Sequence, residues 1–246
     1  MSAAGVLKNR LICGAETKRL WRVVQKLLRH DISGWALTGG IAVEIHCLPD
    51  GIPALERPLN DVDFVAASFN CAPETLTEEF WFLHVHPHEP PGKTILQLVD
   101  AENELRIDLF RAYGAMMTRA TFLEFSFGTI QLISKEDVLA RTARVLLDLR
   151  QGIPVAAKHA NDYFRLRKHL QNTDLEAAWQ DHRKPWHPVM FREADELVEG
   201  LIGTHHTLLI TPQYSRNVTE ACCRCAPTPA FPLADRHTVL SLLGHC

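Results

Sequence analysis

Patterns of apolar residues divide the chain into a first half dominated by strands and a second half dominated by helices. The first helical spacing predicts an amphipathic helix over about residues 16–30, whose apolar positions are Leu20, Val23, Val24, Leu27 and Leu28. The run "GWALTGG" then predicts a short strand that ends in two glycines, and "IAVEIHCL" resumes a helical pattern up to Pro49. The order is therefore strand, Gly-Gly turn and helix.

Further strands are predicted from short apolar runs in the first half. These runs are "DVDFVAA", "FWFLHV", "TILQLVD", "ELRIDLFRA" and "TIQLI", and the polar turn "AENE" joins the third to the fourth. Residues 49–58, "PDGIPALERP", hold three prolines and a glycine, which is typical of a connection.

The second half predicts four helices followed by an irregular tail. Ser134 is placed as an N-cap with Asp137 three residues later, so a helix is expected from there to Gly152. The segments "VAAKHANDYFRLRKHL", "DLEAAWQDH" and "PVMFREADELVEGLI" predict three more helices. We therefore expect an α+β fold with a mixed sheet in residues 1–133, a helical extension in 134–204 and an irregular tail in 205–246.

Composition is that of a soluble protein with a full core. The chain has 246 residues, is 46% apolar and has a formal net charge of −3, which gives no global attraction to nucleic acid or anionic lipid. No apolar run approaches the length of a membrane span. The seven scattered cysteines suit reduced thiols, so a cytoplasmic location without a membrane partner is predicted.

Three aspartates stand inside predicted strands. Asp61 and Asp63 in "LNDVDFV" alternate, so they point to one side of a strand, and their Cα atoms lie roughly 6 to 7 Å apart. At an effective dielectric of about 20, their repulsion is on the order of 2 to 3 kcal/mol. Asp108 in "RIDLF" repeats the pattern. Hard carboxylate oxygens select Mg²⁺ or Mn²⁺, so the sequence predicts a divalent metal site at Asp61, Asp63 and Asp108.

The Gly-Gly turn is a candidate phosphate site. A strand that ends in Thr38, Gly39 and Gly40 and opens a helix presents free backbone N–H groups and the positive helix end to a ligand. A tight turn without a ligand is the alternative interpretation.

These motifs together resemble the nucleotidyltransferase pattern of the DNA polymerase β superfamily. "LTGGIAVEIH", "RPLNDVDFV" and "LRIDLF" match its Gly-Gly or Gly-Ser helix start, its Asp-x-Asp and its third acid on a neighbouring strand. The resemblance covers about residues 35–170. It looks closest to the bacterial aminoglycoside and lincosamide nucleotidyltransferases and to the AbiEii-like toxin group.

The resemblance implies roles for the residues that match. Gly39 and Gly40 would hold the β- and γ-phosphates of a nucleoside triphosphate, Asp61 and Asp63 would ligate the metals, and Asp108 would complete the second metal site and accept the proton of the acceptor hydroxyl. The implied reaction moves a nucleoside monophosphate from the triphosphate to a hydroxyl of a small molecule, an RNA or a protein. The sequence does not specify the acceptor, the nucleotide or the oligomeric state.

A second pair of residues resembles the family's Lys-x-x-x-Asp helix. Lys158 and Asp162 in "KHANDYFRLRK" are one helical turn apart, so Lys158 would reach the triphosphate and Asp162 would orient it or an acceptor. A solvated ion pair is the alternative for these two residues. Arg106, two residues before Asp108, shares its predicted sheet face and offsets its charge, either as a structural ion pair or as a substrate contact.

The sequence departs from the family pattern on the helix after residue 134. The AbiEii-like group tends to carry a lysine there, whereas "EDVLARTAR" offers Arg141 and Arg144. An alternative function therefore stays open, a catalytically weak nucleotide-binding or regulatory module of a toxin–antitoxin-like system. Retention of all three acids favours the enzyme, and the missing lysine favours the module.

Overall fold

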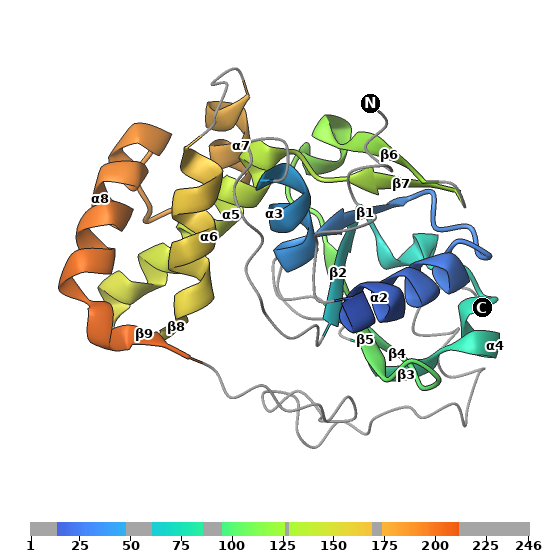
Figure 1. The fold of residues 1–246 in the computed structure, drawn as a ribbon. Helices are drawn as coiled ribbons and strands as arrows, with labels where there is room; N and C mark the ends of the chain where they lie inside the picture. Colours follow the sequence, from blue (N-terminus) through green and yellow to red (C-terminus); the bar gives the residue numbers. More distant parts are fainter. Residues whose placement is uncertain (1–13, 48–60, 86–94, 126–127, 169–173, 212–246) are drawn as a thin grey trace.

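A seven-stranded mixed sheet forms one part of the protein and a group of helices the other (Figure 1). The computed structural model describes residues 14–47, 61–85, 95–125, 128–168 and 174–211. The sheet order is β3 (Trp81–Val85), β4 (Ile95–Asp100), β5 (Leu105–Arg111), β2 (Asp61–Ala66), β1 (Trp35–Thr38), β7 (Gly128–Leu132) and β6 (Thr121–Phe125). Strand β2 pairs with β5, and β1 with β7, in parallel, whereas the other neighbours are antiparallel. The structure confirms the predicted α+β class.

The helices follow the predicted order. They are α2 (Gly14–Leu27), α3 (Gly39–Cys47), α4 (Leu76–Glu79), α5 (Lys135–Leu146), α6 (Ala157–Arg167), α7 (Leu175–His182) and α8 (Phe191–Thr204). Short 3₁₀ segments lie at Phe69–Cys71, Met116–Arg119, Leu147–Gln151 and His206–Leu208, and a small parallel pair joins β8 (Val155–Ala156) to β9 (Leu209–Ile210). No helix in the described part of the chain is long and apolar enough to cross a membrane.

Several predicted boundaries and elements need correction. Helix α4 and strands β8 and β9 were not predicted, and β9 lies within the segment 205–246 that was expected to be irregular. Helix α6 begins at Ala157 because Val155 and Ala156 pair with β9.

Helix α2 ends at Leu27 and not at residue 30, and α5 ends at Leu146, where the chain tightens into a 3₁₀ turn that Gly152 closes in the left-handed conformation. Strand β6 was missed because it lies at the edge of the sheet, where Phe122 is 70% exposed and Leu123 is buried, which leaves little apolar alternation to read.

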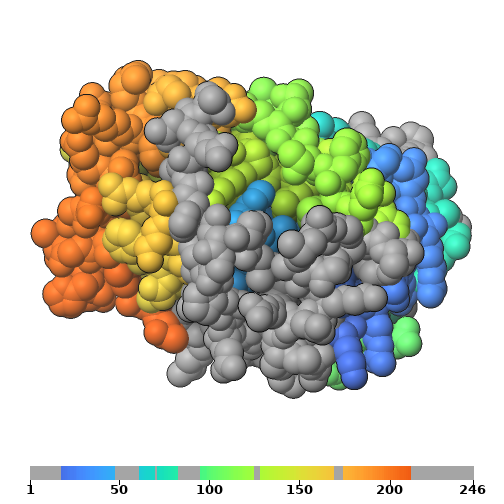
Figure 2. Space-filling view, turned by 45° about the horizontal axis from the view of Figure 1, so that its top comes forward, coloured from blue at the N-terminus to red at the C-terminus, as the bar shows by residue number. Residues whose placement is uncertain are grey.

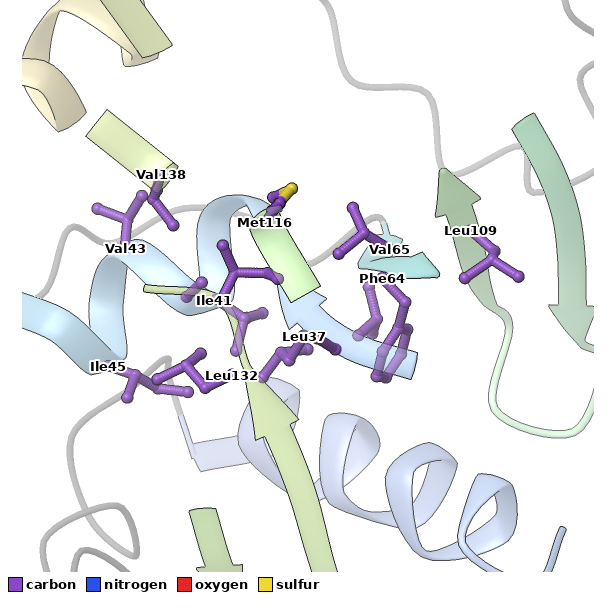
Figure 3. Packing of buried hydrophobic residues seen from close by; sticks show 14 of the residues in the cluster. Leu37, Ile41, Val43, Ile45, Phe64, Val65, Leu109, Met116, Leu132 and Val138 are labelled. Carbon is purple, nitrogen blue, oxygen red and sulfur yellow. The ribbon is translucent and has the colours of Figure 1, made fainter. Parts of the chain in front are cut away.

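Helix α2 covers one face of the sheet. Leu20, Val23, Val24 and Leu27 are buried as predicted, whereas Leu28, just after the helix, is partly buried. Phe64 points from β2 toward this helix, and Val65 leaves the strand in the opposite direction (Figure 3). The side chains of Asp61 and Asp63 alternate with Phe64, so they share the face of Val65. The sheet therefore has one face that packs on α2 and another that carries the aspartates.

Helix α3 lies between the sheet and the helical part. Ile41 and Ile45 lie near Leu37 and Leu132, and Val43 meets Val138 of α5 (Figure 3). His46 Nε2 forms a 2.7 Å hydrogen bond with the carbonyl oxygen of Ile133, just before α5. The Gly-Gly turn at the start of α3 is thus held by packing on both sides.

The predicted N-cap of α5 is confirmed and belongs to a buried polar network. The Asp137 amide donates to Ser134 Oγ at 3.0 Å. The fully buried Asp137 carboxylate accepts hydrogen bonds from Arg119 at 2.9 and 2.7 Å and pairs with His182 Nε2 at 3.1 Å. Although burial raises the pKa of this carboxyl, the hydrogen bonds from Arg119, His182 and Ser134 outweigh it and lower the pKa to about 2.

We expect this network to make the fold acid-sensitive. The folded pKa of Asp137, about 2, lies below its ordinary value of 3.8, so its stabilisation is full above that ordinary value and is lost as the pH falls toward 2. The shift corresponds to about 2 kcal/mol of unfolding free energy. Urea unfolding at pH 5, 4, 3 and 2 should show this decline. An equally steep decline in Asp137→Asn would contradict the assignment.

Several expectations fall outside the described residues. They concern the connection at 49–58 and the tail beyond residue 211. The division at residues 133 and 204 stays a prediction, although α8 does end at Thr204.

Candidate functional site

The predicted site residues of three strands meet at one point of the sheet. In the parallel pairing of β2 with β5, Asp63 stands opposite Asp108, and Asp61 stands opposite Arg106. In the antiparallel pairing with β1, Thr38 stands opposite Asp63. The strand end that opens α3 therefore lies beside the carboxylates, as the motif order requires.

Arg106 bridges two of the three carboxylates. Its Nη2 lies 2.7 Å from Asp61 Oδ2, and its Nε donates to Asp108 Oδ1 at 2.9 Å. Gln97 Nε2 of β4 also donates to Asp108 Oδ1, at 3.2 Å. The Arg106 guanidinium thus offsets part of the carboxylate charge, as predicted for Asp108 from the shared sheet face, and it also bonds to Asp61.

Arg106 forms no hydrogen bond with Asp63, so Asp63 lacks the cation that Asp61 and Asp108 share. Burial, then repulsion from Asp61 and Asp108, raises the pKa of Asp63 to about 7, although the positive charges of Arg141 and Lys158 oppose the rise. Burial also raises the pKa of Asp108 to about 6, against the opposing charge of Arg106. The carboxylate group therefore holds more negative charge than one arginine neutralises, which favours binding of a further cation.

Gly39 brings the start of α3 against Asp63. Its φ is +64°, and a Cβ placed there would lie 1.8 Å from Asp63 Oδ2. No other residue type has room at this position, because every other side chain begins with a Cβ. The close approach sets the positive end of α3 beside the carboxylates.

A cleft of about 190 Å³ opens next to this contact, between α3, α5 and α6. Its walls include Thr38, Gly39, Gly40, Asp63, Arg141, Thr142, Lys158, His159 and Asp162. The space-filling view shows blue atoms of α3 recessed in the surface next to green atoms (Figure 2). The structure brings all the predicted phosphate-binding residues to this cleft, and it places Lys158 and Asp162 in its wall.

A buried ion pair fixes α6 against α3. Arg165 donates to both carboxylate oxygens of Glu44 at 2.8 Å, and both residues are buried. Asp162, which is 4% exposed, lies 3.8 Å from Arg165. Sequence reasoning missed this pair, although a lone glutamate in the apolar run "IAVEIH" was a signal that a buried charge needs a partner.

The donor set fits a divalent metal that arrives with a phosphate. No three His, Cys, Asp or Glu side chains in the described residues are already gathered around a metal position. Asp61 and Asp108 each give an oxygen to Arg106, which leaves their other oxygens and the Asp63 carboxylate as hard donors. Mg²⁺ is usually held by one or two carboxylates plus substrate phosphates, so this arrangement suits it.

Two solved structures resemble this chain remotely. No protein-family model matches the chain, and no curated protein sequence matches it significantly. A crystal structure of an antigenic nucleotidyltransferase-like protein from Paracoccidioides brasiliensis is 16% identical with a TM-score of 0.40, covering 80% of this chain and 94% of that one. The structure of JHP933 from Helicobacter pylori is 14% identical with a TM-score of 0.42, covering 85% and 88%. Likenesses as distant as these assign no activity.

Proposed function

We propose that the protein is a nucleotidyltransferase that moves a nucleoside monophosphate from a nucleoside triphosphate to a hydroxyl group. The observation that carries this proposal is the pairing of Asp63 with Asp108 on parallel strands, directly beside Gly39 at the start of α3. Carboxylates attract cations, whereas the positive N-terminal end of a helix attracts anions. Their close approach suits a ligand that has both metal cations and phosphate anions.

The residues around the cleft have separate tasks in binding. The backbone N–H groups at Gly39 and Gly40 face the triphosphate, and Lys158 and Arg141 add positive charge from α6 and α5. Arg141 stands on the helix where the resembling family tends to carry lysine, and its guanidinium can hold a phosphate in a bidentate manner. Asp162, beside Arg165, sits in the cleft wall to orient the ligand.

The carboxylates would hold Mg²⁺ or Mn²⁺, which when bound stabilises the developing charge on the phosphates. Asp61 and Asp63 are the proposed ligands, and Asp108 is the third. Asp108 is also the proposed acceptor of the hydroxyl proton, because it stands opposite Asp63 on the neighbouring parallel strand. Arg106 orients Asp61 and Asp108 from the side through its two hydrogen bonds.

Metal and nucleotide should stabilise the protein together more than separately. Because Arg106 already bridges Asp61 and Asp108, Mg²⁺ alone should raise the melting temperature only slightly, and Mg²⁺ with a triphosphate should raise it clearly. In Arg106→Gln the carboxylates lose their internal cation, so Mg²⁺ alone should have a larger effect than in wild type. Differential scanning fluorimetry measures both shifts. A wild-type shift from metal alone as large as that from metal plus triphosphate would indicate a preformed structural metal site instead.

Turnover is tested with each α-labelled nucleoside triphosphate, Mg²⁺ and a panel of small hydroxyl compounds, total RNA and protein. Label transferred to any acceptor supports the proposal. Tight triphosphate binding without transfer to any of them would support the alternative, a nucleotide-binding or regulatory module.

A further inference from the structure

A second cleft lies further along the aspartate face of the sheet. Val65 follows Asp63 by two residues on β2, and Phe110 follows Asp108 by two on β5, so each continues the face of its aspartate. Both residues line a cleft of about 260 Å³. The charged residues that line it are Arg111, Arg141, Arg144, Asp148 and Lys184.

The two clefts meet at α5. Arg141 and Val145 line both the first cleft, beside Gly39 and Lys158, and the second one. A ligand in the second cleft would therefore lie next to a triphosphate in the first. On β2, Asp63 lines the first cleft and Val65, two residues later, lines the second. This is the relation that an acceptor must have to a nucleotide donor.

The second cleft has a surplus of positive charge. Among the described residues of its wall, four are basic and one, Asp148, is acidic, and Lys184 pairs with Asp148. Arg141 and Arg144 form no hydrogen bond or ion pair with the described residues, and Arg141 Nη1 is buried without an acceptor there. A buried donor without a partner costs free energy, which an anionic ligand would recover.

Aromatic rings hold the two guanidinium groups in place. The Arg141 guanidinium lies 4.8 Å from the centre of the Phe110 ring, and that of Arg144 lies 4.7 Å from the centre of the Tyr113 ring. The Tyr113 ring in turn packs on His182 at 5.2 Å between centres. These cation–π contacts restrain the two guanidinium groups, whose N–H groups can still bind an anion.

We propose that the second cleft binds the phosphate group of the acceptor, and that the acceptor is a small phosphorylated compound with a free hydroxyl. This inference rests on the proposed nucleotidyltransferase function. Arginine pairs recognise phosphate through charge-assisted, bidentate hydrogen bonds. The volume lies near the lower end of the range for small-molecule sites, which suits a sugar phosphate.

The reaction that this placement implies is a substitution at the α-phosphorus of the triphosphate. The acceptor hydroxyl oxygen forms a bond to the α-phosphorus of the triphosphate, and the bond from that phosphorus to the bridging oxygen of pyrophosphate breaks. The hydroxyl proton passes to Asp108, and pyrophosphate leaves with the electron pair.

Ribose 5-phosphate, ribose and inorganic phosphate are suitable probes. Their binding to the full chain is measured by calorimetry with Mg²⁺ and a non-transferable triphosphate analogue at saturation, so that the first cleft is already filled. Ribose 5-phosphate should bind, and ribose should bind at least tenfold more weakly. Arg144→Gln should weaken ribose 5-phosphate binding about tenfold or more, because it removes a charge-assisted contact. Arg144→Lys should restore part of the affinity.

Two further variants frame this result. Arg150→Gln removes an exposed arginine that lines neither cleft, so it should change nothing. Lys184→Gln leaves Asp148 without its ion-pair partner, so it should weaken the binding of ribose 5-phosphate. This variant tests the inference if Arg144→Gln does not fold. Triphosphate binding should stay normal in the Arg144 and Lys184 variants.

Each contrary outcome has its own meaning. Equal binding of ribose and ribose 5-phosphate, or an unchanged affinity in Arg144→Gln and Lys184→Gln, would overturn the inference and leave the nucleotidyltransferase proposal standing. Weakened triphosphate binding in Arg144→Gln would indicate that the second cleft binds the nucleoside, and it would also overturn the inference. An RNA oligonucleotide that binds a hundredfold more tightly than ribose 5-phosphate would exclude a small acceptor. Failure of wild type to bind any triphosphate would instead remove the proposed function itself.

Discussion

Asp63→Asn should abolish nucleotide transfer and leave the metal-free fold as stable as wild type or slightly more stable. The substitution keeps the shape of the side chain but removes a buried charge. Burial, then repulsion from Asp61 and Asp108, raises the pKa of Asp63, so both effects disfavour the ionised carboxylate. It also removes a proposed metal ligand, which is worth several kcal/mol of transition-state stabilisation, so the transfer rate should fall about a thousandfold or more. Single-turnover transfer and urea unfolding of the metal-free protein measure the two effects.

Two companion variants define the role of Asp63. Asp108→Asn should reduce turnover more than triphosphate binding, because Asp108 is assigned to the acceptor side of the reaction. Asp174→Asn alters an exposed carboxylate that lines neither cleft and should leave transfer unchanged. If Asp63→Asn lost several kcal/mol of stability while each folded molecule kept full activity, the pair Asp61 and Asp63 would be a structural device and the nucleotidyltransferase proposal would fail.

The largest loss of stability is expected from Arg165→Met. This substitution leaves the carboxylate of Glu44, which is 2% exposed, buried without its bidentate partner. Breaking a buried pair from one side costs about 3 to 5 kcal/mol of unfolding free energy. Urea unfolding monitored by tryptophan fluorescence measures the loss.

The double variant Glu44→Met with Arg165→Met distinguishes two contributions to the unfolding free energy. One is the cost of leaving the Glu44 carboxylate buried without Arg165, and the other is the net contribution of the intact ion pair. Removing both charges should recover most of the stability, because apolar replacement of a whole buried pair is often neutral. Arg192→Met, on the exposed face of α8, serves as the matched control. A double variant as unstable as Arg165→Met alone would show that packing, and not the unpaired charge, causes the loss.

The helices and most of the strands could be predicted because their signals are local. The cap at Ser134 and the alternation that places Asp61 and Asp63 on one face depend only on residues a few positions apart. The errors lie where local signals are weak. An edge strand such as β6 buries little, and the end of α5 depends on how the last turn tightens before Gly152.

The candidate site was predictable in its residues but not in its electrostatics. The order of the motifs identified Gly39, Asp63 and Asp108 as candidate site residues from the sequence alone. Arg106 was expected on the face of Asp108, yet its bond to Asp61 depends on the parallel register of β2 with β5. Arg106 therefore forms hydrogen bonds with Asp61 and Asp108 but not with Asp63.

The sequence by itself determined the α+β class, the faces of the strands and the acidic and glycine motifs, because these follow from periodicity and side-chain chemistry within short segments. Only the tertiary structure decided that Glu44 meets Arg165 across 121 residues and that Arg141 stands between two clefts. Such contacts depend on how α3, α5 and α6 pack against one another. Packing is chosen by the burial of the whole core, and no short segment encodes it.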